Sequence, residues 1–149
     1  MTIIPLSENR FADLVRLIRG LADYEHLEPP DAEAIERLRT DAFGSPRRFE
    51  AALAVDDEDR AVGYAIWYET YSSFRARPAM FLEDIFVMEN ARGSGVGGAL
   101  FDHVRALGQQ RGCAQMEWIV LDWNTLARDF YHRRDARWMR EWLLYRVSC

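Results

Sequence analysis

The stretch that most constrains the fold is 81–100, where a strand-like segment meets a glycine-rich turn and then a helix. Apolar, aromatic and β-branched residues dominate up to Met88, and after the turn the apolar residues recur at helical spacing. Four of the six residues in 93–98 are glycine. The first N–H groups of a helix have no partner within the helix, and glycine leaves them unshielded. We therefore predict an anion-binding turn suited to a phosphate group.

Composition narrows the class of protein. The chain has 149 residues, of which 49% are apolar, so we expect a single domain, 1–149, with one core. The net charge of -5 predicts no nucleic-acid partner and mildly favours a cationic one. Two cysteines are too few for a disulfide framework. Because the sequence has no signal-peptide pattern and no long apolar run, we expect a cytoplasmic protein without a membrane partner.

Every one of the 19 basic residues is arginine, and this absence of lysine excludes chemistry that depends on a lysine amine. The three histidines have no metal-ligand spacing with each other or with cysteine, so we predict no metal site. Cys113 follows a glycine between a predicted helix and a predicted strand, and we expect no catalytic role for it.

Patterning along the chain predicts an α+β or mixed-sheet domain. Strands are expected at 2–6, 49–55, 61–70, 79–88, 115–121 and 138–147. Helices are expected after the N-caps Ser7 and Asp31, after the glycine turn, and from Thr125 with Asn124 as the N-cap. Residues 71–78 are expected to form a loop.

The glycine turn is compatible with more than one ligand. Residues 93–98 satisfy G-x-G-x-x-G, and Glu117 lies 19 residues beyond Gly98, which is close to the spacing of a dinucleotide-binding oxidoreductase. However, nearly 80 residues precede the predicted strand and turn, whereas a dinucleotide-binding domain usually opens with this motif. A Walker A loop is excluded, because Ala99-Leu100 stands where Lys-Ser/Thr is required. A turn that only allows close packing of helix on strand remains an alternative.

The same residues also read Arg92-x-x-Gly95-x-Gly97, which resembles the pyrophosphate loop of the Gcn5-related N-acetyltransferase (GNAT) superfamily. The similarity covers nearly the whole chain and is specific for the diamine acetyltransferase family, which includes spermidine/spermine and thialysine acetyltransferases. It rests on the segments 17–25, 42–44, 62–64, 81–88, 121–124 and 130–134. Residues 71–74 carry serine and phenylalanine where the spermidine/spermine enzymes have aspartate and tryptophan, which is closer to the thialysine branch. Asp135 stands where the family usually has glycine.

The resemblance implies a mostly antiparallel central sheet with flanking helices, whose fourth and fifth strands splay apart to admit acetyl-CoA. It implies that the pantetheine amides pair with the backbone of 85–87 and that the pyrophosphate lies on the glycine turn. The cofactor-binding residues it implies are Ile85, Phe86, Val87, Arg92, Gly93, Ser94, Gly95, Val96, Gly97, Gly98, Asn124 and Tyr131.

The resemblance also implies transfer of an acetyl group to the primary amine of a small cationic acceptor: a diamine, a polyamine or a thialysine-like or lysine-like amino acid. Glu83 is the candidate base, and Tyr131 is the candidate acid that protonates the leaving thiolate. The acceptor-binding residues it implies are Tyr24, Glu25, Glu83 and Asp84. The family further implies a homodimer. An acyl-CoA-binding sensor without turnover is the alternative from another functional class.

Overall fold

A five-stranded sheet, in the order β1-β2-β3-β4-β5, organises the first part of the chain. The computed structural model describes residues 1–149 and separates them into two units, Met1–Trp118 and Ile119–Cys149. The first unit contains β1 (Thr2–Pro5), the 3-10 turn η1 (Glu8–Arg10), α1 (Phe11–Glu25), α2 (Ala32–Phe43), β2 (Glu50–Val55), β3 (Ala61–Ser72), β4 (Arg77–Val87), the 3-10 turn η2 (Glu89–Ala91), α3 (Val96–Gln110) and β5 (Met116–Glu117). The second contains α4 (Thr125–His132).

The sheet is mixed and mostly antiparallel, which confirms the predicted fold class. Strands β1 to β4 pair antiparallel with their sequence neighbours. Strand β5 pairs with β4 in parallel, and only at Met80 with Met116 and Phe81 with Glu117. The pairing of β4 with β5 therefore covers only these two residue pairs.

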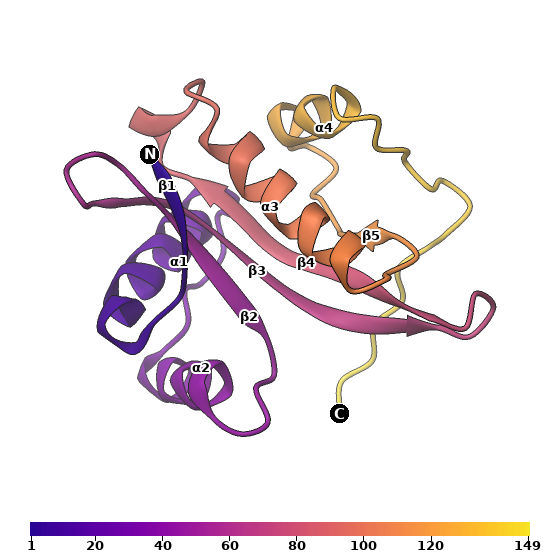
Figure 1. Ribbon diagram of the computed structural model, residues 1–149, viewed down its shortest axis with the longest axis horizontal. Coiled ribbons are helices and arrows are strands. Elements are labelled where there is room, and N and C mark those ends of the chain that lie inside the picture. Colours follow the sequence, from indigo (N-terminus) through magenta and orange to yellow (C-terminus); the bar gives the residue numbers. More distant parts are fainter. The chain divides into compact units, whose positions relative to one another are not determined.

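Helices cover both faces of this sheet, with α1 and α2 on one side and α3 on the other (Figure 1). Helix α1 ends where His26 adopts a left-handed conformation with φ 57°, shortly before Pro29 and Pro30. Helix α2 begins at the predicted cap, because the Asp31 carboxylate accepts a hydrogen bond of 2.8 Å from the Ala34 N–H. No helix of the chain has the length and apolar character needed to cross a membrane.

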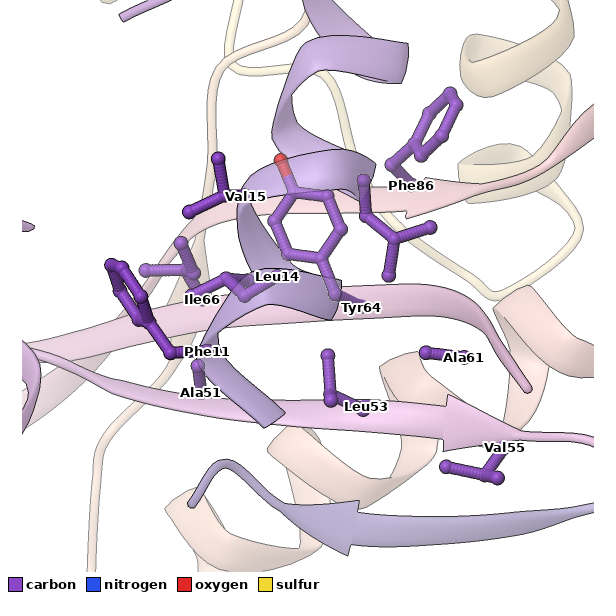
Figure 2. Close-up of a cluster of buried hydrophobic side chains, with 11 residues drawn as sticks. Phe11, Leu14, Val15, Ala51, Leu53, Val55, Ala61, Tyr64, Ile66 and Phe86 are labelled. Carbon is purple, nitrogen blue, oxygen red and sulfur yellow. The ribbon is translucent and has the colours of Figure 1, made fainter. Parts of the chain in front are cut away.

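A cluster of buried hydrophobic side chains lies between α1 and the sheet, where Figure 2 shows the Tyr64 ring extending from β3 towards α1. Leu14, Leu17, Leu53 and Tyr64 are each 0% exposed. Burial of one such aliphatic side chain contributes about 1.5–3 kcal/mol of transfer free energy, so this layer fixes α1 on the sheet. The end of α1, at Glu25, is thereby held beside β3 and β4.

Two predicted boundaries in this unit are wrong. The Ser7 side chain caps no helix, because it precedes η1, and α1 begins only at Phe11. The loop expected at 71–78 is confined to 73–76, since β3 and β4 continue on either side as a hairpin in which Tyr71 pairs with Pro78. Proline is tolerated there because its missing N–H faces away from β3, on the side where the Pro78 carbonyl accepts the Ala114 N–H at 2.8 Å.

Of two further expected strands, one is much shorter than predicted and the other does not form. The strand expected at 115–121 is reduced to Met116–Glu117, and 138–147 forms no strand. Alternating apolar residues indicate which face of a strand would be buried, but they do not supply a neighbouring strand to pair with. Trp142 and Tyr145 remain 74% and 84% exposed.

Candidate active site

Strand β4 has no partner strand on its outer edge beyond Phe81, because its pairing with β5 ends there. On this edge the Val87 carbonyl accepts a hydrogen bond from the Arg92 side chain. The Met88 N–H donates to the Val62 carbonyl at 2.9 Å, which makes these two residues a hydrogen-bonded pair of the antiparallel ladder. Such pairs alternate with pairs whose backbone groups point away from the partner strand. The N–H and C=O groups of Ile85 and Val87 therefore face the open edge, whereas those of Phe86 face β3.

A β-bulge turns two consecutive carboxylates to one face of the sheet. The register of β3 against β4 shifts so that Ile66 pairs with Asp84 and Trp67 with Leu82, which leaves Glu83 unmatched. Neighbouring side chains in a regular strand point to opposite faces, and an extra residue interrupts this alternation. Glu83 and Asp84 consequently both reach hydroxyl groups on the α1 face.

Those hydroxyl groups belong to two tyrosines of β3. The Tyr64 hydroxyl donates to Asp84 Oδ2 at 3.2 Å, and the Tyr68 hydroxyl donates to Glu83 Oε2 at 3.0 Å. Four residues separate the two tyrosines, so their side chains share one face of β3, the face that packs on α1. Tyr64 is fully buried, Tyr68 and Asp84 are half-buried, and Glu83 is exposed.

The sequence prediction included both carboxylates but missed both tyrosines. The only available signal was their spacing of four residues in a strand, which assigns a common face. The register that brings each hydroxyl to a carboxylate depends on the bulge, and neither strand reveals the bulge by itself.

The electrostatics of this face favour a cation. Burial and the neighbouring charge of Glu83 raise the pKa of Asp84 to about 6, against a smaller opposing effect of the Tyr64 hydrogen bond. Burial also raises the pKa of Glu25, which contributes to the shift at Asp84. Burial and the Glu83 carboxylate raise the pKa of Tyr68 to about 12, so its hydroxyl remains a donor at neutral pH. A bound ammonium group would relieve the repulsion among the three carboxylates.

The raised pKa of Asp84 predicts that Asp84→Asn stabilises the protein without ligand. Ionised Asp84 is less favourable in the folded chain than in the unfolded chain, so its cost is fully present above pH 6 and is lost as the pH falls towards 4. We expect the free energy of unfolding to rise by about 1–2 kcal/mol at pH 8 and by nothing at pH 4. Urea unfolding at both pH values measures this, with the exposed Asp129→Asn as control. A gain that persists unchanged at pH 4 would contradict the explanation.

The glycine turn leaves its N–H groups accessible. Gly93 and Gly95 adopt φ values of 78° and 88°, and a Cβ added at either position would meet nothing within 4 Å. Gly95 is the N-cap of α3, no side chain caps the helix, and its first turn carries no acidic residue. The Ser94 hydroxyl donates back to the Ala91 carbonyl at 2.7 Å. The partial positive charge of the helix start therefore faces open space, which fits the predicted phosphate cradle.

Arg92 links this turn to β4 and α1. Its Nε donates to the Val87 carbonyl at 3.0 Å, and its guanidinium lies 4.8 Å from the centroid of the Tyr24 ring and 5.8 Å from that of Phe86. The predicted acceptor residue Tyr24 is thus adjacent to the predicted cofactor residue Arg92.

The second unit contains the remaining two predicted site residues, Asn124 directly before α4 and Tyr131 within it. Asn124 is the N-cap of this helix and accepts a hydrogen bond of 3.1 Å from the Ala127 N–H, as the sequence predicted. The Tyr131 ring lies 5.3 Å from that of Phe130, centroid to centroid. Asp135 adopts a left-handed conformation with φ 59°, which explains why glycine would suit that position better.

The first unit thus combines an open edge of β4, a glycine turn beyond the end of that strand, and a sheet face that carries Glu83 and Asp84. The sequence model of the Acetyltransferase (GNAT) family matches residues 13–135. The chain therefore belongs to the GNAT acetyltransferase family, and it is an N-acetyltransferase of a family that uses acetyl-CoA. The family match rules out the alternative of a dinucleotide-binding oxidoreductase.

A curated relative agrees with this assignment, and two solved structures share the fold. Thialysine N-epsilon-acetyltransferase of Bos taurus is 34% identical over 141 residues, which cover 90% of this chain and 82% of the relative. Among solved structures, a probable acetyltransferase superposes with a TM-score of 0.86 at 21% identity, over 100% of this chain and 98% of the other. AAC(6')-Iy, solved with the bisubstrate analogue CoA-S-monomethyl-acetylneamine, gives a TM-score of 0.81 at 21% identity over 99% and 98%.

Proposed function

We propose that this enzyme transfers the acetyl group of acetyl-CoA directly to a primary amine of a small cationic acceptor: a diamine, a polyamine or a lysine-like amino acid such as thialysine. The observation that carries this proposal is the convergence of Glu83 and Asp84 on the α1 face, with Glu25 acting on Asp84 through space. Three carboxylates suit an acceptor with more than one positive charge. The name of the bovine relative points to the same substrate class.

For the cofactor, we propose that the pantetheine arm pairs with the open edge of β4. The Ile85 and Val87 backbone groups have the orientation that such pairing requires, so Phe86 would contribute side-chain packing and not backbone pairing. The pyrophosphate would accept hydrogen bonds from the N–H groups of 93–98, and Arg92 would add positive charge nearby. Asn124 and Tyr131 join this set through the family resemblance.

The cradle can be tested by Gly95→Ala. A Cβ at φ 88° costs about 1 kcal/mol of backbone strain and enters the space proposed for the pyrophosphate. We expect acetyl-CoA affinity to fall at least about 10-fold, measured by calorimetry. Gly112→Ala is the matched control, because Gly112 has φ 71° and equally open surroundings at the other end of α3. An equal loss of affinity in both variants would reject the cradle.

For the chemistry, we propose that Glu83 accepts a proton from the incoming ammonium group. An alkyl amine has a pKa of about 10.4, so only about one molecule in 10³ is nucleophilic at neutral pH. As the C–N bond forms and the C–S bond breaks, Tyr131 would donate its phenolic proton to the leaving sulfur. The second proton of the attacking nitrogen would pass through water to the phenolate and restore Tyr131, and the proton held by Glu83 would go to solvent. The charge that develops on the thioester oxygen would be met by a backbone N–H near Phe86; among its neighbours, Ile85 has an N–H on the open edge.

The assay that tests the proposal follows thiol release from acetyl-CoA with a panel of thialysine, lysine, ornithine, putrescine and spermidine. We expect acceleration by at least one of these amines. If none accelerates thiol release while acetyl-CoA still raises the melting temperature, the acyl-CoA sensor becomes the better account.

We also propose that residues 1–149 act as one GNAT domain, since the family match runs from the first unit into the second. A homodimer in the cytoplasm remains our proposal for its working state. The exposed apolar side chains of 138–147, among them Trp142, Leu143, Leu144 and Tyr145, support association with a second copy. Light scattering coupled to gel filtration measures the mass.

A further inference from the structure

The two tyrosine–carboxylate pairs on the α1 face differ in depth. The Tyr68–Glu83 pair is exposed, whereas the Tyr64–Asp84 pair is partly buried, and Tyr64 itself is 0% exposed. Without the bulge, Glu83 would point to the opposite face and could not share a site with Asp84. Two adjacent carboxylates with different partners and different exposure are suited to different tasks.

Resting on the proposed function, we propose that Tyr68 and Tyr64 are positioning residues that give the two carboxylates separate tasks. Tyr68 orients Glu83 as the proton acceptor for the reacting amine, and Tyr64 fixes Asp84 as the negative charge that binds the acceptor cation.

The role of Tyr68 follows from the conformational freedom of an exposed glutamate side chain. The Glu83 side chain has several rotamers, and the hydrogen bond of 3.0 Å from Tyr68 selects one of them. The Tyr68 ring is itself held by packing on Phe81, at 5.3 Å between ring centroids. A carboxylate held in one rotamer presents its oxygens in a fixed direction, so the incoming ammonium group meets an oriented proton acceptor.

The role of Tyr64 follows from the burial of its side chain. Tyr64 packs in the core with its ring 6.4 Å from that of Phe86, so its hydroxyl is a fixed donor for Asp84. The groups that bear on Asp84 are Glu83 on its own strand, Tyr64 on β3 and Glu25 on α1. Both neighbouring carboxylates disfavour its ionisation, and the Tyr64 hydrogen bond opposes them. Tyr64 therefore helps to keep Asp84 negative near neutral pH.

The two roles predict different kinetic signatures. In Tyr68→Phe, Glu83 loses the donor that orients it, so kcat should fall about 10-fold at pH 7, while KM for the amine and acetyl-CoA affinity change little. In Tyr64→Phe, Asp84 is more protonated near its pKa, so KM for the amine should rise about 5-fold at pH 6.5 and return towards the wild-type value at pH 8.5, while kcat changes little.

Tyr71→Phe, on an exposed residue of the same strand, is the control and should reproduce the wild-type profile. Circular dichroism and melting curves identify any variant that fails to fold, and in that case Tyr68→Trp and Tyr64→Met, which also lack the hydroxyl, replace it. An unchanged kcat in a folded Tyr68 variant without the hydroxyl, or an unchanged pH dependence of KM in a folded Tyr64 variant without it, would overturn the inference. Absence of amine-dependent turnover in the wild-type enzyme would instead overturn the proposed function.

Discussion

Replacing Glu83 by glutamine should lower kcat/KM for the amine about 10²- to 10³-fold at pH 7, which is the range for loss of a general base. The loss should shrink as the pH rises towards 10, because the free-amine fraction then grows and the base becomes dispensable. Glutamine keeps the shape of the side chain and an acceptor for the Tyr68 hydroxyl, so the fold and acetyl-CoA affinity should be preserved. Initial rates of thiol release from pH 6.5 to 10 measure the effect.

Glu89→Gln provides the matched control for this substitution. Glu89 is an exposed glutamate of η2, six residues further along the chain, and its replacement changes the net charge by the same amount. An equal loss in both variants would indicate a general electrostatic effect on the cationic substrate. A loss in Glu83→Gln that does not depend on pH would remove proton transfer from the role of Glu83.

Tyr131→Phe should lower kcat about 10²-fold, because the leaving thiolate then takes its proton from water instead of from a positioned phenol. A phenol has an ordinary pKa of about 10, so it is protonated and able to donate at pH 7. Since the substitution removes one oxygen atom and keeps the ring against Phe130, acetyl-CoA affinity should change little. Steady-state turnover together with calorimetric titration of acetyl-CoA separates these two quantities.

Tyr145→Phe is the corresponding control in the second unit, because Tyr145 is 84% exposed. It should leave turnover unchanged. If Tyr131→Phe matched this control in kcat, another group would have to protonate the sulfur, and Tyr131 would remain at most a contact of the cofactor.

The strand, turn and helix of 81–100 could be predicted from the sequence because each signal there is local. The apolar period changes from strand-like to helical across the turn, and glycine stands at the two left-handed positions, Gly93 and Gly95. The Asp31 and Asn124 caps were predictable for the same reason, since a cap needs only residues within one helical turn.

Features that depend on a partner strand could not be predicted in this way. The alternation in 138–147 indicates a strand, but no neighbour pairs with it in this chain. The bulge at Glu83 arises from one unmatched residue between β3 and β4, so it is a property of the pair of strands. The tyrosine partners of Glu83 and Asp84 escaped prediction because their register depends on that bulge.

The most direct test of acetyl transfer to a cationic amine is to follow the acetyl group itself. The enzyme would be incubated with acetyl-CoA carrying a ¹³C-labelled acetyl group and with each amine of the panel, and the products analysed by mass spectrometry and NMR. The account predicts the label in an amide at a primary amine of a small cationic acceptor, with one free CoA thiol for each amide formed. Label found only in acetate or in unreacted acetyl-CoA, with every acceptor unmodified, would contradict it.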